Sequence, residues 1–300
     1  MASTPHLALI GSGRWGSVIK KTLLAMPECE LAYEATHDWK TILEKDDVDG
    51  VLIATPPHTH AGIALPFIKK GLPVFIEKPL TMNLAEAKQL QEAAEESGST
   101  VMVGHQHLYN PPFIKTKELF TSLGNIRLLV GEGANNVLCR EAMWDWSAHD
   151  ISMMIILMGE MPTSVAAWGV APLEPEKSVF ATSTIKLTFR SGANGLIFSS
   201  WLMPQKRKKL TLVGEKKSLV YDDVLPEKKV TLFEENGSKI SSPAYDSGMP
   251  LTLELQAFVR TITEKEKPLS GIAEGLAIVR ILEAAEKSIA TDGTPVAVTS

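Results

Sequence analysis

A carboxylate and an imidazole lie four residues apart in segment 144–151 of this 300-residue chain. If one helix carries Asp145 and His149, the two side chains share a face, because residues four apart are neighbours on a helix surface. A carboxylate beside an imidazole fixes its tautomer and stabilises the imidazolium that forms when the ring takes a proton. The pair predicts a general base. A structural interpretation stays open, because Ser147 and Asp150 have the spacing of a capping box, in which His149 would only fill the first helical turn.

A possible partner for this base lies in the first half of the chain. Glu77, Lys78 and Pro79 follow the strand-like run 73–76, and Pro79 restricts this loop. Ligands of open α/β sheets bind at the carboxyl ends of strands, so Lys78 could donate to a substrate oxygen. A surface lysine beside a turn proline is the alternative. A second polar cluster follows the preceding strand and consists of Thr55, Pro56, Pro57, His58, Thr59 and His60.

A glycine-rich loop directly follows the first strand-like run and precedes a helical segment. Small residues are needed in such a loop because the turn is tight and the backbone must approach a pyrophosphate, which the helix N-terminus then holds. The position of this G-x-G-x-x-G pattern between a strand and a helix predicts a dinucleotide site. The predicted cofactor-binding residues of the loop are Gly11, Ser12, Gly13, Arg14, Trp15 and Gly16.

The residue that would contact the adenosine ribose is ambiguous. An acidic side chain is expected about twenty positions after the glycine loop, and the candidates are Glu34, Thr36 and Asp38. Thr36 has the usual separation, and an uncharged residue there leaves the choice between NAD and NADP open. His37 or Lys40 could meet a 2′-phosphate.

The hydrophobic patterns predict the elements that must position these residues. The first hundred residues alternate short apolar runs with helical periodicity, which is typical of a parallel sheet covered by helices. From residue 125 to residue 235, β-type segments dominate. We therefore predict an α/β N-terminal Rossmann parallel sheet and an α+β C-terminal domain with an open mixed or antiparallel sheet. The predicted strands span 6–10, 50–54, 73–76, 100–103, 163–170, 180–189, 195–201 and 208–213, and the predicted helices span 16–25, 61–70, 84–97, 144–158, 251–263 and 272–290.

Composition and charge argue against several classes of protein. The formal net charge of -5 disfavours nucleic-acid binding, which needs a basic stripe. The longest apolar run is far too short to cross a bilayer, so we expect no membrane partner. Cys29 and Cys139 lie far apart and imply no disulfide framework, and no export signal opens the chain. We expect a cytoplasmic protein.

Together these motifs carry a family resemblance that covers nearly the whole chain. The glycine loop, the cluster after residue 54, the segment 77–80 and the Asp145/His149 pair occur in an order that resembles the glucose-fructose oxidoreductase / inositol dehydrogenase / MocA (Gfo/Idh/MocA) family. Segment 103–111 is similar to that family's crossover into its second domain. Residues 144–152 and 201–223 look like the branch that contains UDP-N-acetylglucosamine 3-dehydrogenase-type enzymes.

The resemblance implies an oxidoreductase that transfers hydride between NAD or NADP and a hydroxyl carbon of a sugar, polyol or nucleotide sugar. It implies a triad in which His149 removes the hydroxyl proton, Asp145 supports the imidazolium and Lys78 steadies the substrate oxygen. The further cofactor-binding residues that we expect are Thr55, Pro56, His58, Glu77 and Lys78.

The resemblance also implies two domains, with residues 1–106 for the dinucleotide and residues 107–300 for the substrate. The exposed face of the second sheet is expected to form a homo-oligomer, a dimer or tetramer. Two departures from the family pattern stand out. Segment 33–45 is too short for the helix and strand that most members have there, which predicts a shallow adenosine pocket. Ser152 occupies a position where an aspartate often follows the catalytic histidine.

Two other functions fit parts of the sequence. A metal enzyme would need several histidines to converge, but their i,i+2 pairs lie in strand-end loops and no cysteine or carboxylate cluster completes a coordination shell, so we predict no metal. The other alternative is a non-catalytic dinucleotide sensor, which would have no need of Lys78, Asp145 and His149. The histidines in question are His58, His60, His105, His107 and His149.

Overall fold

The computed structural model describes residues 4–136, 141–174 and 179–298, so Cys139 lies outside the described residues. The chain divides into two compact units. The N-terminal unit consists of Met1–Tyr109 with Gly248–Val279, and the C-terminal unit of Asn110–Ser247 with Arg280–Ser300. No described helix is both long enough and apolar enough to cross a membrane.

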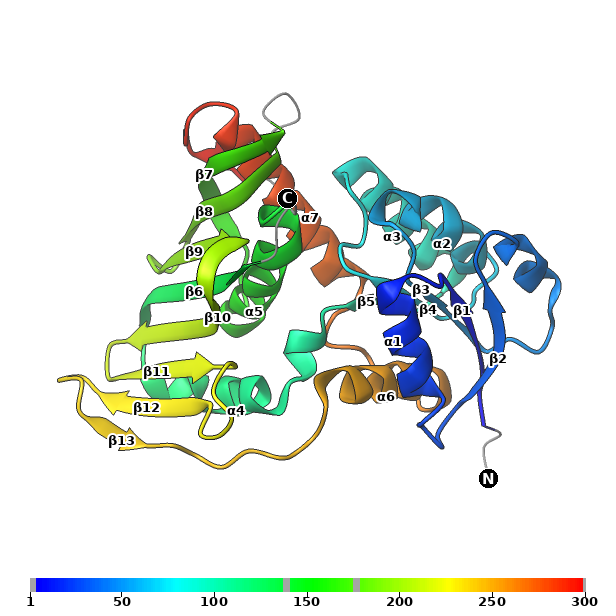
Figure 1. Cartoon of the computed structure of the whole chain (residues 1–300), viewed down its shortest axis with the longest axis horizontal. Coiled ribbons are helices and arrows are strands. Elements are labelled where there is room, and N and C mark those ends of the chain that lie inside the picture. The colour runs from blue at the N-terminus through cyan, green and yellow to red at the C-terminus, as the bar shows by residue number, and fades with distance from the viewer. Residues whose placement is uncertain (1–3, 137–140, 175–178, 299–300) are drawn as a thin grey trace. The chain divides into compact units, whose positions relative to one another are not determined.

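The N-terminal unit is built on a five-stranded, all-parallel sheet (Figure 1). Its strands are β1 (His6–Ile10), β2 (Glu30–Ala35), β3 (Gly50–Ile53), β4 (Val74–Glu77) and β5 (Val101–Gly104), in the order β2-β1-β3-β4-β5. Every residue of β3, β4 and β5 is buried, as expected for parallel strands with both faces covered. β2 is missing from the strands that the sequence predicts, because its half-exposed, partly charged residues follow the pattern of an edge strand.

Helices cover this sheet. They are α1 (Arg14–Leu23), α2 (His60–Lys69), α3 (Leu84–Ser97) and α6 (Pro250–Thr263), and the 3-10 helix η1 spans Trp39–Glu44. α3 begins after Asn83, whose side chain accepts a hydrogen bond from the amide of Glu86 at 2.8 Å, and ends at Gly98 in the left-handed conformation. In the described chain, η1 is the only regular element between β2 and β3, so segment 33–45 holds no further strand.

One part of the predicted domain division differs from the structure. The predicted break after residue 106 lies close to the observed one between Tyr109 and Asn110, but α6 belongs to the N-terminal unit rather than to the second domain. The Phe258 ring of α6 lies 5.8 Å from the Phe75 ring of β4, and Gly50 leaves room for Phe258. α6 therefore packs its apolar face on strands that are far from it in the sequence.

The C-terminal unit is built on a nine-stranded open mixed sheet (Figure 1). Its strands are β6 (Ile126–Asn136), β7 (Pro162–Glu174), β8 (Val179–Phe189), β9 (Asn194–Ser200), β10 (Leu202–Gly214), β11 (Lys217–Asp222), β12 (Val230–Glu234), β13 (Lys239–Ser241) and β14 (Val296–Ala297). Their order is β13-β12-β11-β10-β6-β9-β8-β7-β14, and among the described pairs only β6 and β9 run parallel. The two sheets confirm the predicted fold class.

Helix α5 (Ala148–Met158) covers one face of this mixed sheet, and glycines on the strands permit its close approach. A Cβ atom on Gly131 would lie 2.8 Å from the carboxyl carbon of Asp150, and one on Gly195 would lie 3.0 Å from Met154 Sδ. The remaining α-helices are α4 (Pro111–Leu119) and α7 (Ile272–Ile289), and α7 contributes residues to both units.

Candidate active site

The three glycines of the loop between β1 and α1 are needed for three different reasons. Gly11 has a φ of +115°, and a Cβ atom there would lie 2.5 Å from the carbonyl oxygen of Ala54. A Cβ atom on Gly16 would overlap the carbonyl oxygen of Gly11, so the helix packs directly on the turn. Gly13 is the N-cap of α1, and no atom lies within 4 Å of the position that its Cβ would take. A pyrophosphate in a dinucleotide loop needs such open space before a helix N-terminus.

A pocket of about 540 Å³ opens at this loop. Of the predicted cofactor-binding residues, Gly11, Ser12, Gly13, Arg14, Trp15, Thr55 and Pro56 line the pocket, whereas Gly16, His58, Glu77 and Lys78 do not. Thr36 and His37, which the sequence offers only as candidates, also line it. Thr59 belongs to the predicted cluster and lines the pocket, whereas sequence reasoning missed Trp39, Ala54 and Ile63. The only sequence signal for these three is their position soon after β2 and β3, where ligands of parallel sheets bind.

Glu77, the last residue of β4, joins the glycine loop to the loop after β4. Its carboxylate accepts hydrogen bonds from the indole N–H of Trp15 and from the backbone amide of Lys78, the latter at 3.1 Å. Gly104 of β5 leaves room for this carboxylate, since a Cβ atom there would lie 3.0 Å from it. Burial raises the pKa of Glu77 to about 7, although Trp15 and Lys78 act in the opposite direction. Glu77 thereby holds the backbone of Lys78 at the carboxyl end of the strand.

The histidines of the N-terminal unit have different surroundings. His60 is buried, and its ring nitrogens lie 2.9 Å from the carbonyl oxygens of Thr55 and Pro79, so it connects the loops after β3 and β4. His105 is also buried, and burial lowers its pKa to about 3. His58 is exposed. Among the described residues, no group of three or more histidine, cysteine or acidic side chains is placed to hold a metal ion.

Asp145 and His149 lie in the C-terminal unit on two different kinds of helix. Met143–Ser147 forms a π-helical turn, η5, and α5 follows directly. The prediction of one continuous α-helix over 144–158 is therefore wrong, because the helical period changes between the two residues. Both side chains are partly exposed. Single π-turns inside helices occur frequently at functional sites.

The capping box that the sequence offers as an alternative role for this segment is not formed. Ser147 makes no side-chain cap to α5, and its hydroxyl instead lies 2.8 Å from the hydroxyl of Ser199 on β9. Asp150 is buried against the sheet. Burial raises the pKa of Asp150 to about 8, although the charge of Lys208 acts in the opposite direction.

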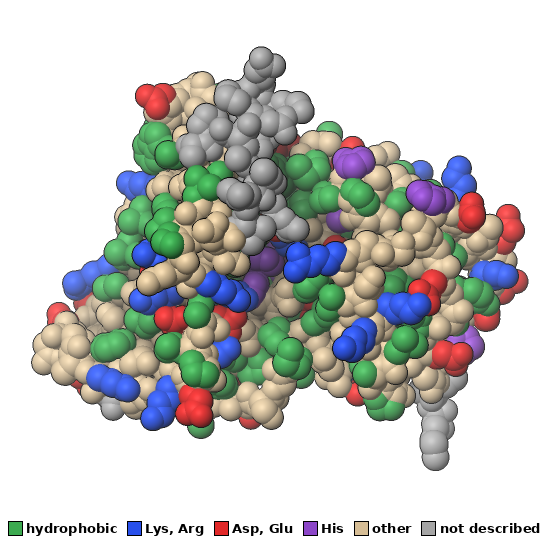
Figure 2. Space-filling view, in the orientation of Figure 1, with side chains coloured by type: hydrophobic (Ala, Val, Ile, Leu, Met, Phe, Trp, Pro, Cys, Tyr) green, Lys and Arg blue, Asp and Glu red, His purple; other side chains and the backbone are tan. Residues whose placement is uncertain are grey.

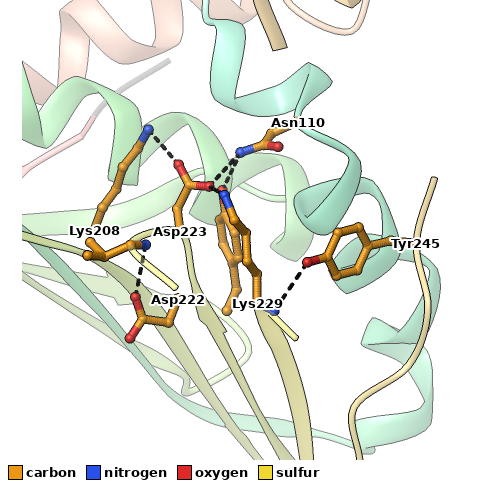
Figure 3. A network of polar contacts seen from close by, with 8 residues as sticks. Asn110, Lys208, Asp222, Asp223, Lys229 and Tyr245 are labelled. Carbon is orange, nitrogen blue, oxygen red and sulfur yellow. Dashed lines mark hydrogen bonds and ion pairs between the residues drawn. The ribbon is translucent and has the colours of Figure 1, made fainter. Parts of the chain in front are cut away.

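Lys208 belongs to a network of polar side chains centred on Asp223 (Figure 3). The Asp223 carboxylate lies 2.8 Å from the ammonium groups of Lys208 and Lys229, and it accepts a hydrogen bond from Asn110 Nδ2 at 3.1 Å. Asn110 also donates to the Tyr221 hydroxyl at 2.7 Å. The network connects the N-terminus of α4 to β10, to β11 and to the residue before β12, and it orders this end of the sheet.

The pocket of the N-terminal unit fits a nicotinamide dinucleotide. The N-terminus of α1 is open at Gly13 and has no acidic residue in its first turn, so its dipole favours an anion there. The pocket also has an aromatic wall at Trp39 and hydroxyl groups at Ser12 and Thr55. Apolar surface with a few polar groups is the usual composition of a cofactor site.

Comparison with known families shows to which family this chain belongs. Residues 20–105 match the model described as "Oxidoreductase family, NAD-binding Rossmann fold", and residues 142–298 match the model described as "Oxidoreductase family, C-terminal alpha/beta domain". The chain belongs to the Gfo/Idh/MocA oxidoreductase family. The glycine loop precedes the matched part of the Rossmann domain, so its assignment depends on the geometry given above.

Individual relatives agree with the family. A protein from Magnetospirillum magnetotacticum MS-1, provisionally assigned to the oxidoreductases, has a crystal structure that superimposes on this one with a TM-score of 0.85. The two sequences are 33% identical, and the match covers 94% of this chain and 99% of the Magnetospirillum chain. The myo-inositol 2-dehydrogenase of Thermotoga maritima is 26% identical over 280 residues, 87% of this chain and 82% of that enzyme. The UDP-N-acetylglucosamine 3-dehydrogenase of Acidithiobacillus ferrooxidans is 30% identical over 152 residues, 49% of this chain and 48% of that enzyme.

These findings confirm the predicted enzyme class. The chain is an NAD(P)-dependent oxidoreductase of the Gfo/Idh/MocA family. Nothing in the names of these relatives favours the non-catalytic sensor.

Proposed function

We propose that this Gfo/Idh/MocA enzyme oxidises or reduces a hydroxyl-bearing carbon of a sugar, polyol or nucleotide sugar. The observation that carries the proposal is the glycine loop, which opens the N-terminus of α1 onto a pocket at the carboxyl edge of the parallel sheet. The relatives named for inositol and for UDP-N-acetylglucosamine support the substrate class. The bound cofactor supplies or accepts the hydride, while the protein sets distance and charge.

Three side chains handle the proton and the substrate oxygen in this proposal. His149 accepts the hydroxyl proton, Asp145 stabilises the imidazolium that results, and Lys78 donates a hydrogen bond to the substrate oxygen. The hydrogen bond from the Lys78 amide to Glu77 supports the role of Lys78, because it holds the residue at the strand end. The π-turn η5 supports the role of Asp145, because its geometry differs from that of a plain helix.

A substrate panel tests the activity directly. Inositols, other polyols, aldoses and nucleotide sugars are incubated with the enzyme and each dinucleotide, and the reduced cofactor is followed by absorbance. We expect turnover with at least one of these classes. Dinucleotide binding without turnover of any hydroxyl compound would favour the sensor instead.

Replacement of His149 by alanine tests the general base. Turnover should fall by roughly a hundredfold to ten-thousandfold, the usual contribution of general acid-base catalysis, while cofactor affinity stays unchanged. Asp145→Asn should also slow turnover, and the double variant should be little worse than His149→Ala alone, because groups that act as one unit are not additive. His6→Ala, a change of a partly exposed histidine outside the pocket, is the control. A His149→Ala enzyme that keeps more than about a tenth of wild-type turnover would contradict the assignment.

We further propose a homo-oligomer, a dimer or tetramer, that forms through the sheet face opposite α5. Leu196 follows Gly195, which faces α5, so Leu196 points to the opposite face. Leu196, Trp168 and Val170 are 38%, 41% and 55% exposed, and hydrophobic side chains reach the surface of this unit in Figure 2. A cluster of exposed apolar side chains is typical of an interface. Light scattering should show an oligomer that Trp168→Asp dissociates, and a monomeric wild-type protein would refute the interface.

The proposal places the enzyme in the cytoplasm, with a small-molecule substrate and no nucleic-acid or membrane partner. The buried free thiol of Cys29 supports a reducing compartment. Fractionation of cells that express the tagged protein would test this location.

A further inference from the structure

The segment after β2 forms one end of the pocket, where a Rossmann site receives the adenosine ribose. The amide of Gly11 bonds to the carbonyl oxygen of Ala35 at 2.9 Å, which holds this segment beside the glycine loop. Thr36 comes next, and its hydroxyl donates a hydrogen bond to the hydroxyl of Ser12 at 3.0 Å. Two hydroxyl groups therefore occupy the place where an NAD site has a carboxylate.

The acidic residues nearest to Thr36 in the sequence do not line the pocket. None of the described residues that line the pocket is acidic. Glu34 forms an ion pair with Lys20 of α1 at 2.8 Å, and Asp38 precedes η1 without lining the pocket. A carboxylate is what normally accepts hydrogen bonds from the free ribose hydroxyls of NAD. This pocket has no such acceptor, and it also has no charge that would repel a phosphate.

One cationic side chain lines the pocket close to Ser12 in the sequence. It is Arg14, the first residue of α1, and His37, which follows Thr36, also lines the pocket. Lys40 Nζ lies 5.9 Å from the centre of the Trp39 ring, which forms part of the wall. A phosphate monoester carries about two negative charges near neutral pH, and a guanidinium matches its geometry better than any other side chain does.

We infer that this pocket binds NADP(H) in preference to NAD(H), with the 2′-phosphate received by Ser12, Arg14 and Thr36. The inference rests on the proposed dinucleotide site and adds to it the identity of the cofactor. All three residues are exposed, so salt screens their attraction for the phosphate. The preference is therefore moderate and decreases as ionic strength rises.

Titration of the purified protein with NADPH and with NADH, followed by calorimetry, tests the inference without any substrate. At low salt NADPH should bind about tenfold to a hundredfold more tightly than NADH, which corresponds to one hydrogen bond to a charged group. Arg14→Gln should weaken NADPH binding alone. Thr36→Asp should weaken NADPH binding and leave NADH binding equal or tighter. Lys21→Gln removes an exposed cation of the same helix outside the pocket and should change neither affinity.

The outcomes distinguish this inference from the proposed function. Equal affinities, or tighter binding of NADH, would overturn the NADP preference and leave the dinucleotide site intact. Absence of binding by both dinucleotides would overturn the proposed function together with the inference. If a Thr36→Asp protein with native circular dichroism keeps the wild-type preference, the hydroxyl pair does not select the cofactor and the inference fails.

Discussion

Replacement of Gly13 by valine should separate cofactor binding from folding. The φ of Gly13 is -65°, which any residue adopts, and no atom lies within 4 Å of the position of its Cβ. Valine therefore fits without displacing protein atoms, but its methyl groups occupy the space before the first amides of α1. We expect the free energy of unfolding to change by no more than about 1 kcal/mol, the typical size of an N-cap effect.

The loss of affinity follows from the contacts that valine would prevent. A pyrophosphate at the N-terminus of α1 accepts hydrogen bonds from backbone amides, and each hydrogen bond to a charged group contributes about 1.5–3 kcal/mol. Loss of two such bonds corresponds to about 3–6 kcal/mol, or a rise in Kd of roughly a hundredfold to ten-thousandfold. Calorimetric titration with each dinucleotide measures this change.

Gly62→Val provides a matched control for the same substitution. Gly62 lies on the exposed side of α2, no atom lies within 4 Å of its Cβ position, and it does not line the pocket. This variant should bind dinucleotide as the wild type does. A folded Gly13→Val protein whose Kd stays within about threefold of wild type would refute the placement of the pyrophosphate at this loop.

Three further predictions concern the fold and its buried charges. Gly16→Ala should lower the free energy of unfolding in urea by about 1–3 kcal/mol, because the new Cβ overlaps the backbone of the turn; an unchanged midpoint would contradict this packing. The stability of Asp150→Asn relative to wild type should increase as the pH rises from about 5 to 8, by up to about 1.4 kcal/mol per pH unit. In this range the raised pKa keeps a proton on Asp150 in the folded wild type, whereas the unfolded chain has released it, so wild type loses stability and the asparagine variant does not. Thermal melts across this range measure the difference, which would stay constant if Asp150 were ionised. Asp223→Asn should destabilise the protein most at neutral pH and progressively less in acid. Burial alone raises the pKa of Asp223, but Lys208 and Lys229 lower it overall. The stability that the ionised carboxylate contributes is therefore lost as the carboxylate is protonated. A loss of stability independent of pH would show that the two ion pairs contribute nothing.

Local pattern was sufficient for most of the N-terminal unit. The buried strands β3, β4 and β5 are short apolar runs, and such runs between helical segments indicate a parallel sheet. The edge strand β2 lacked this signal, because it pairs with another strand on one side only and its side chains are partly exposed. The glycine loop could be found because its three glycines and the flanking elements are consecutive in the chain.

The candidate site was only partly predictable. Residues of the glycine loop and the start of the cluster after β3 line the pocket as consecutive stretches. Trp39 and Ile63 come from separate segments, and their shared position depends on where β2 and β3 end in the folded sheet. The helical pattern over 144–158 gave no warning of the π-turn, because a single inserted residue hardly changes the hydrophobic period.

The sequence by itself determined the class of each sheet, the glycine loop between β1 and α1 and the residue types of the proposed triad, because hydrophobic period and glycine spacing act over a few residues. Only the tertiary structure decided that α6 covers the parallel sheet, that Glu77 packs against Gly104 and that Asp150 is buried. It also decided that the Thr36 hydroxyl donates a hydrogen bond to the Ser12 hydroxyl of the glycine loop. Each of these features is a contact between segments far apart in the chain, and the burial that stabilises such a contact is not contained in any local stretch of sequence.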